Sequence, residues 1–206
     1  MGIISDIVPQ KRNKNYFSVY IDNKYSFSLS SSDLNFLKLK VNDTLTEERV
    51  NDLIRIYSLQ KAKDYAYKIL SRKAYSEKAM FEKLVTKYNE KIAAEVLKGL
   101  KELDYINDEK LIYEYAKGKI EFRPMGRWKL KQDLTQKKFD ADMIRSAIDK
   151  IFNEVDEFEL AMKVFNKKFG NIKKVDSKML MKIKNHLLSN GFDSQIVIKI
   201  IQELRY

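Results

Sequence analysis

Cysteine is absent from this chain, and the prolines number two, the glycines six, and tryptophan and histidine one each. Without cysteine there are no disulfides, no zinc sites built on thiolates and no cysteine nucleophile, which fits a reducing cytoplasm. No apolar run approaches the roughly 20 residues of a membrane-spanning helix. The N-terminus "MGIISDIVPQKR" lacks the basic and apolar regions of a signal peptide. These absences predict a soluble, cytoplasmic protein.

Groups that carry out catalysis are also scarce. The glycines form neither a GxGxxG nor a GxxxxGK[ST] phosphate loop. The carboxylates are scattered among lysines at helical spacing, which is typical of exposed ion pairs. Catalysis needs a nucleophile, a tuned acid or base, a metal or a cofactor cradle. We therefore expect no enzyme activity, no catalytic residue, no metal site and no cofactor.

Acidic residues are few relative to basic ones, and the imbalance is patterned. Forty Lys and Arg oppose 29 Asp and Glu, giving a net charge of +11. Residues 110–138 hold nine basic residues against three acids, and residues 163–184 hold eight lysines against Asp176 alone. The total charge alone is as compatible with compositional bias and charge for solubility as with a polyanionic partner. The patterning favours a polyanionic partner, which could be nucleic acid, a nucleoprotein or an anionic membrane.

The strand patterns lie within the first thirty residues. In "YFSVYI" (16–21) and "YSFSLS" (25–30), successive side chains alternate between a face that packs and a face toward water, which is typical of half-buried strands. Asp22-Asn23-Lys24 between them predicts a β-hairpin turn. A third strand from "IISDIVPQ" (3–10) is expected at an edge, since Pro9 cannot donate to a ladder. Because an isolated hairpin is marginal, it should pack on the helices that follow.

From residue 31 onward the pattern is helical. Ser31-Ser32-Asp33 is expected to cap a short helix that ends near Leu39. Thr46 is expected to cap a longer helix through residues 47–70. After residue 70 the chain contains one proline and no strand alternation.

Two offsets align the helical part with itself, which indicates repeats. At an offset of 50, the matched pairs are Ala66 and Ala116, Leu70 and Ile120, Met80 and Leu130, and Leu84 and Leu134. At an offset of 53, they are Leu134 and Leu187, Phe139 and Phe192, Asp140 and Asp193, Ile144 and Val197, and Ile148 and Ile201. We expect Leu84, Leu134 and Leu187 to be buried in equivalent places. Asp140 and Asp193 suit helix N-caps, and no strand is expected after residue 45.

The predicted fold class is mainly α, with tandem three-helix repeats forming an elongated helical body and a small N-terminal β-hairpin or sheet extension. The predicted segments are an extension at 1–57 and three-helix repeats at 58–106, 107–155 and 156–206. The third repeat carries a short insertion at 169–176. In this register His186 matches Asp133, which predicts a solvated or rim histidine.

The one tryptophan stands among basic residues and on the outward side of its helix. Leu130 and Leu134 define the inward face, which places Trp128 roughly 140° from its centre. Lys78 takes the same place in the first repeat. Two interpretations stay open, packing against a neighbouring repeat, as Met181 would in the third, or contact with a partner. Tryptophan is both mostly buried and enriched at interfaces.

The turn before this helix has the residues of an anion site. Pro124 and Gly126 suit the turn, and Arg123 and Arg127 flank the helix N-terminus. Backbone donors and guanidinium groups there would receive a phosphate or a carboxylate. We therefore interpret residues 121–134 as a binding site for a negatively charged partner. The candidate binding residues are Arg72, Lys73, Lys117, Lys119, Arg123, Arg127, Trp128, Lys129, Lys131, Lys137, Lys138, Lys173 and Lys174.

The sequence resembles the RecX family, the small helical regulators of the RecA recombinase. The resemblance rests on "SRKAYSEKAMFEKL" (71–84), "YINDEKLIYEYAKGKI" (105–120), "RPMGRWKLKQDL" (123–134) and the three-helix repeat. It covers essentially the whole helical part, and the N-terminal hairpin is similar to an extension in some branches of the family. Asn107 stands where the family more often has Asp, and it still suits a helix cap.

The resemblance implies a non-enzymatic modulator of homologous recombination, DNA repair and the SOS response. Family members lie in the groove of the RecA–DNA filament, and they alter filament growth, ATP hydrolysis, strand exchange and co-protease activity. The implied partners are the RecA nucleoprotein filament and the backbone of its single-stranded DNA, with inhibition as the expected effect. No membrane partner is expected, and the chain is expected to be a monomer.

Two other functions fit the same residues. A helical protein that binds single-stranded DNA or RNA directly would need exposed aromatics on its basic face, where Trp128 is the one strong candidate. A helical adaptor for an unrelated acidic protein needs only the charge. Because the sequence offers a single strong candidate for base stacking, contact with protein and with the DNA backbone is the favoured interpretation.

Overall fold

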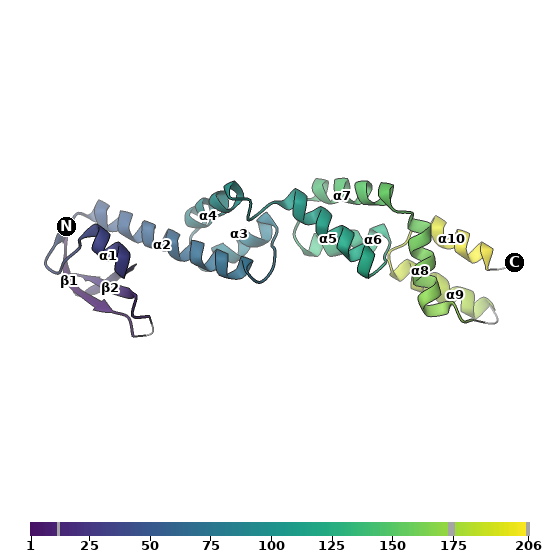
Figure 1. The fold of residues 1–206 in the computed structure, drawn as a ribbon, viewed down its shortest axis with the longest axis horizontal. Helices are drawn as coiled ribbons and strands as arrows, with labels where there is room; N and C mark the ends of the chain where they lie inside the picture. Colours follow the sequence, from purple (N-terminus) through teal and green to yellow (C-terminus); the bar gives the residue numbers. More distant parts are fainter. Residues whose placement is uncertain (12, 173–175, 205–206) are drawn as a thin grey trace. The chain divides into compact units, whose positions relative to one another are not determined.

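The computed structural model describes residues 1–11, 13–172 and 176–204 (Figure 1). In chain order the strands are β1 (Gly2–Pro9), β2 (Tyr16–Ile21), β3 (Lys24–Ser30) and β4 (Thr44–Leu45). The helices are α1 (Ser31–Leu37), α2 (Glu47–Leu70), α3 (Glu77–Val85), α4 (Glu90–Glu102), α5 (Asp108–Phe122), α6 (Arg127–Gln136), α7 (Ala141–Glu154), α8 (Glu157–Phe169), α9 (Ser177–Ser189) and α10 (Ser194–Glu203). The chain divides into two compact units, residues 1–73 with 81–102 and residues 74–80 with 103–206.

The first unit contains the predicted hairpin in a four-stranded antiparallel sheet of order β3-β2-β1-β4. Asp22 and Asn23 form its turn with φ of 50° and 63°, the positive values that suit the twist of a tight hairpin. The third strand is confirmed as β1, but its predicted edge position is wrong at one end. There Gly2 and Ile3 pair with β4, a two-residue strand too short to leave an alternating pattern.

The sheet buries one face against α2, as the weakness of an isolated hairpin required. Ile4, Val19, Phe27 and Leu29 of the sheet share a core with Leu53 of α2. These side chains are at most 1% exposed. Packing against a 24-residue helix thus supplies the burial that a two-stranded ribbon lacks.

Side-chain caps fix the helix boundaries where the sequence predicted them. Thr46 accepts a hydrogen bond from the backbone N–H of Arg49 at the start of α2. Asn107 caps α5. Asp140 and Asp193 cap α7 and α10, so the matched aspartates of the two repeats have the same role. α1 is capped by Ser30, one residue earlier than predicted, and ends at Leu37.

The second unit contains α5–α7, here called the second repeat, and α8–α10, the third repeat. Their buried residues form one hydrophobic core. The predicted equivalents Leu134 and Leu187, and Leu84 of α3, are all 0% exposed, which confirms their predicted burial. Among the described residues no strand follows Leu45. The predicted segment boundaries stay a prediction, and α2 runs without a break through residues 57 and 58.

Candidate basic interface of the second and third repeats

The basic stretch around Trp128 joins two helices of the second repeat. α5 ends at Phe122, a turn holds Pro124, and Gly126 takes the N-cap of α6. Gly126 has no side chain to cap the helix, so the first N–H groups of α6 need acceptors from elsewhere. The third repeat supplies them.

Backbone carbonyls of the α9–α10 turn receive two of these donors. The N–H of Gly126 donates to the carbonyl of Asn190 at 2.9 Å, and the N–H of Trp128 donates to that of Gly191 at 3.1 Å. A Cβ on Gly126 would overlap the Gly191 carbonyl, and a Cβ on Gly191 would overlap the Lys129 backbone. Gly191 also has a φ of 83°, which a residue with a Cβ rarely adopts. Two glycines therefore permit direct backbone contact between the repeats.

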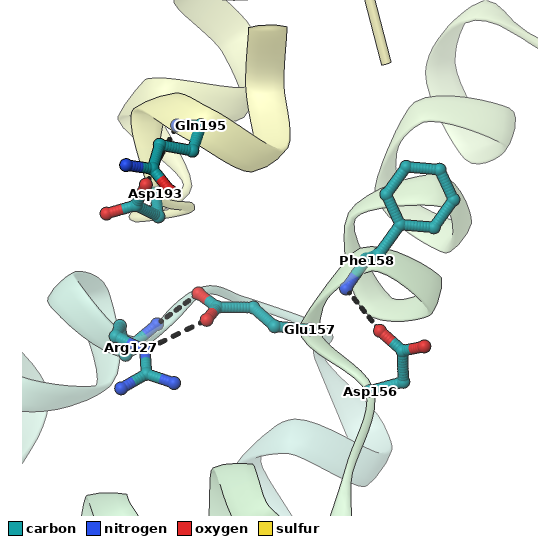
Figure 2. Close-up of polar contacts among 6 residues, drawn as sticks. All are labelled: Arg127, Asp156, Glu157, Phe158, Asp193 and Gln195. Carbon is teal, nitrogen blue, oxygen red and sulfur yellow. Dashed lines mark hydrogen bonds and ion pairs between the residues drawn. The ribbon is translucent and has the colours of Figure 1, made fainter. Parts of the chain in front are cut away.

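A third donor, the Arg127 backbone N–H, and the Arg127 side chain are taken by Glu157, the first residue of α8 (Figure 2). Its carboxylate accepts from the Arg127 backbone N–H at 3.2 Å and from Nε at 2.9 Å. The Glu157 side chain is 8% exposed and that of Arg127 is 41% exposed. The Arg127 guanidinium also lies 4.9 Å from the centre of the Phe152 ring. The carboxylate at this helix N-terminus thus belongs to the chain itself.

Trp128 also lies at this contact between the second and third repeats, here called the joint, but its ring points outward. The residue is 57% exposed, and the Lys131 ammonium lies 5.8 Å from the indole centre. The matched residues Lys78 and Met181 are exposed as well. The outward placement deduced from Leu130 and Leu134 is therefore correct, and the repeat's own core leaves this position free for another use.

The other predicted lysines of the second repeat lie beside tyrosine rings. Lys137 and Lys119 lie 4.7 Å and 5.5 Å from the centre of Tyr115. Lys119 also forms an ion pair with Asp133 at 2.9 Å. This hydrogen bond raises the pKa of Lys119 above its ordinary value, so the ammonium is held in place and stays charged. Lys117 lies 6.0 Å from the ring of Tyr113.

The remaining candidates are distributed between the two units. Arg123, Lys131 and Lys138 are exposed, and Lys129 donates to the carbonyl of Ser189 at 3.4 Å. Arg72 and Lys73 are exposed but belong to the first unit. Lys173 and Lys174 lie outside the described residues.

An exposed aromatic that we did not predict lies at the end of α5. Phe122 is 91% exposed and directly precedes Arg123. The helical period held the signal, because Phe122 lies about 200° from the inward-facing Ile120. Trp128 is therefore not the one strong candidate for stacking in this stretch. Glu157 was also missed, and its sequence neighbours give no indication of a partner thirty residues earlier.

Metal and membrane features are absent from the described part of the chain. No cluster of three or more His, Asp or Glu side chains there could hold a metal ion. No helix there has both the length and the apolar character needed to cross a membrane. The chemistry that this surface offers is cationic and aromatic.

Comparison with known proteins finds relatives of this chain over nearly its whole length. Three domain profiles match, described as the regulatory protein RecX N-terminal domain (residues 2–46), the first RecX three-helix domain (62–100) and the third (154–201). The regulatory protein RecX of Clostridioides difficile (strain 630) is 31% identical over 205 residues, covering 99% of this chain and 96% of that one. The chain belongs to the RecX family.

Other RecX proteins match over similar lengths. The regulatory protein RecX of Clostridium botulinum (strain Alaska E43) is 29% identical over 207 residues, covering 98% of this chain and 96% of its own. A crystal structure of a regulatory protein RecX superposes with a TM-score of 0.66 at 25% identity, covering 98% of this chain and 100% of that one. The chain thus has the fold of the RecX regulatory proteins over nearly its whole length.

Proposed function

We propose that this RecX-family chain is a non-catalytic regulator that binds the groove of the RecA–DNA filament and inhibits the recombinase, its ATP hydrolysis and its co-protease activity. Binding would use the basic surface around α6, in the cytoplasm and as a monomer. The observation that carries the proposal is the exposed Trp128 beside Lys131, on a helix whose N-terminus is fixed by the third repeat. An exposed aromatic held on a rigid element is typical of an interface hot spot.

The basic residues add attraction to this aromatic contact. Residues 110–138 carry nine cations against three acids, and one of those acids, Asp133, is paired with Lys119. Arg123 and Lys131 are exposed. Such a surface fits a groove lined by DNA phosphates and acidic protein, where electrostatic attraction also speeds association.

Removing the indole tests the proposal directly. Trp128→Ala should weaken filament binding by about 2 kcal/mol, roughly 30-fold, and should leave the thermal midpoint nearly unchanged because the ring is outside the core. Met181→Ala, at the matched position of the third repeat, is the control and should bind normally. Affinity is measured by fluorescence anisotropy on preassembled RecA filaments. A fall of many degrees in the midpoint with normal binding would make Trp128 a packing residue.

Salt measures how much of the attraction is electrostatic. If about four lysines or arginines neutralise phosphates, affinity should fall roughly 20-fold between about 50 and 150 mM salt. The measurement is the filament dissociation constant as a function of salt, with light scattering as a check that the filament itself stays assembled. A flat profile would mean that apolar contact dominates and that the basic surface is not the binding face.

Direct binding to single-stranded DNA is the second candidate, and Phe122 favours it. Its ring is 91% exposed beside Arg123, and bases stack on exposed aromatics of basic surfaces. The two functions separate in one comparison, the affinity for RecA filaments against that for the same oligonucleotide without RecA. Filament regulation requires clearly tighter binding to the filament.

A further inference from the structure

A pocket in the second unit is lined by three elements that are distant in sequence, and two of them supply cations. Its volume is about 370 Å³, and it opens between the turn before α6, α8 and the end of α9. The polar residues that line it are Arg123, Lys163, Lys167, Lys168, His186 and Asn190. Pro124 and Val164 supply apolar wall. No carboxylate is among the lining residues.

Three cations of this pocket have no carboxylate partner in the part of the chain that the structure describes. Within the described ranges no carboxylate forms an ion pair with Arg123, Lys163 or Lys167. Lys163 and Lys167 are four residues apart on α8, so they lie on one face and repel each other. This contrasts with Arg127 in the same unit, whose charge is met by Glu157. An anion is the component that would relieve the repulsion.

The single histidine of the chain lies in the wall of this pocket. His186 Nδ1 is 3.2 Å from the Lys168 ammonium, and because an ammonium has no acceptor, Nδ1 accepts the hydrogen bond. The ring packs edge-on against Phe169, with centroids 5.5 Å apart. Burial, followed by the charges of Lys168 on α8 and Lys129 on α6, lowers the pKa of His186 below its ordinary value of 6.5. The imidazole is therefore neutral near pH 7.

We propose that this pocket binds a phosphate group in the backbone of a nucleic-acid strand. A phosphate presents several oxygens, which suit the fork of Arg123 and the point charges of three lysines. Pro124 and Val164 would face the less polar sugar. The inference rests on the proposed function and deepens it, because it gives the basic surface a defined phosphate site that includes the third repeat.

The experiment uses His186 as its reporter, because no other histidine contributes to the spectrum. Its ring resonances are followed by NMR in the full chain while inorganic phosphate, or an oligomer of abasic phosphodiester units, is added. The abasic oligomer should give a saturable shift. It should also raise the His186 pKa, measured between about pH 5 and 8, since a bound anion offsets the charges of Lys168 and Lys129.

Paired charge variants locate the binding. Lys163→Ala/Lys167→Ala should weaken abasic-oligomer binding at least tenfold. Lys178→Ala/Lys184→Ala removes the same charge from α9 outside the pocket, and it should bind within about twofold of the unchanged protein. The affected lysines are exposed, so neither variant should unfold. The absence of a saturable shift in the unchanged protein, or equal losses in both variants, would overturn the proposal.

Two further comparisons separate free phosphate from a nucleic-acid strand, and the phosphate site from the proposed filament regulation. Binding of inorganic phosphate without binding of the abasic oligomer would overturn the assignment to a strand. Filament affinity of the same variants is measured separately. Normal filament binding without a His186 response would overturn the phosphate site and leave the proposed function standing. A clear His186 response without filament binding would overturn the proposed function and leave the phosphate site standing.

Discussion

Gly126→Ala should destabilise the second unit by about 3–5 kcal/mol. The new methyl group would overlap the Gly191 carbonyl, so the joint between the repeats must open. Opening breaks the hydrogen bonds from Gly126 to Asn190 and from Trp128 to Gly191, and each buried donor left unpaired costs about 1–3 kcal/mol. Urea unfolding followed by the fluorescence of Trp128, which lies at the joint, measures the change.

Gly118→Ala provides the matched control. Gly118 lies within α5 of the same unit, and a Cβ there would meet nothing within 4 Å. The substitution should stabilise the helix by about 0.5–1 kcal/mol, because alanine loses less backbone entropy than glycine. If Gly126→Ala unfolds within about 1 kcal/mol of the unchanged protein, the repeats are not joined as closely as the structure shows.

Much of this fold follows from local patterns in the sequence. Period-two alternation and turn residues predict the hairpin, and side-chain caps predict the helix starts. Trp128 could be placed outward because Leu130 and Leu134, only a few residues away, fix the inward face of the same helix. The burial of Leu84 and Leu187 follows from the repeat register. The first three inferences need only residues close together in the chain, and the last needs only the alignment of one repeat with the next.

The contacts that build the joint could not be predicted in the same way. Glu157 meets Arg127 across thirty residues, and nothing in the sequence around either residue specifies the other. The cationic pocket likewise depends on how α8 lies beside the turn that holds Arg123. Charge counting identified these regions as basic, but it could not tell a paired cation from one without a counter-charge. Phe122 is different, since the helical period alone would have revealed its exposure.

The Arg127 pair should separate stability from binding. Arg127→Ala removes the guanidinium from a carboxylate that is 8% exposed, and breaking a buried ion pair typically costs about 3–5 kcal/mol. Because the Arg127 side chain is 41% exposed, water screens part of its charge, and we expect a loss of about 2–3 kcal/mol. The free energy of unfolding, again from urea titration, is the measurement.

Three further variants, Glu157→Ala, Arg127→Ala/Glu157→Ala and Arg145→Ala, show whether the loss comes from the pair itself. Arg127→Ala/Glu157→Ala removes both partners, so it should cost less than the sum of the single variants, by about 1–2 kcal/mol of coupling. Arg145→Ala removes an arginine whose pair with Asp142 is 75% and 84% exposed, and it should change stability by less than about 1 kcal/mol. These differences would identify Arg127 as a joint residue.

The same variants then test whether stability and filament binding depend on different residues of this surface. If the assignments are correct, Arg127→Ala lowers stability while the folded protein binds filaments nearly normally, and Trp128→Ala does the opposite. Adjacent residues on α6 would thus serve different purposes, one holding the third repeat and the other meeting the partner. A stable Arg127→Ala variant with weakened filament binding would show instead that the guanidinium leaves Glu157 to contact the filament, and Arg127 would then be a binding residue.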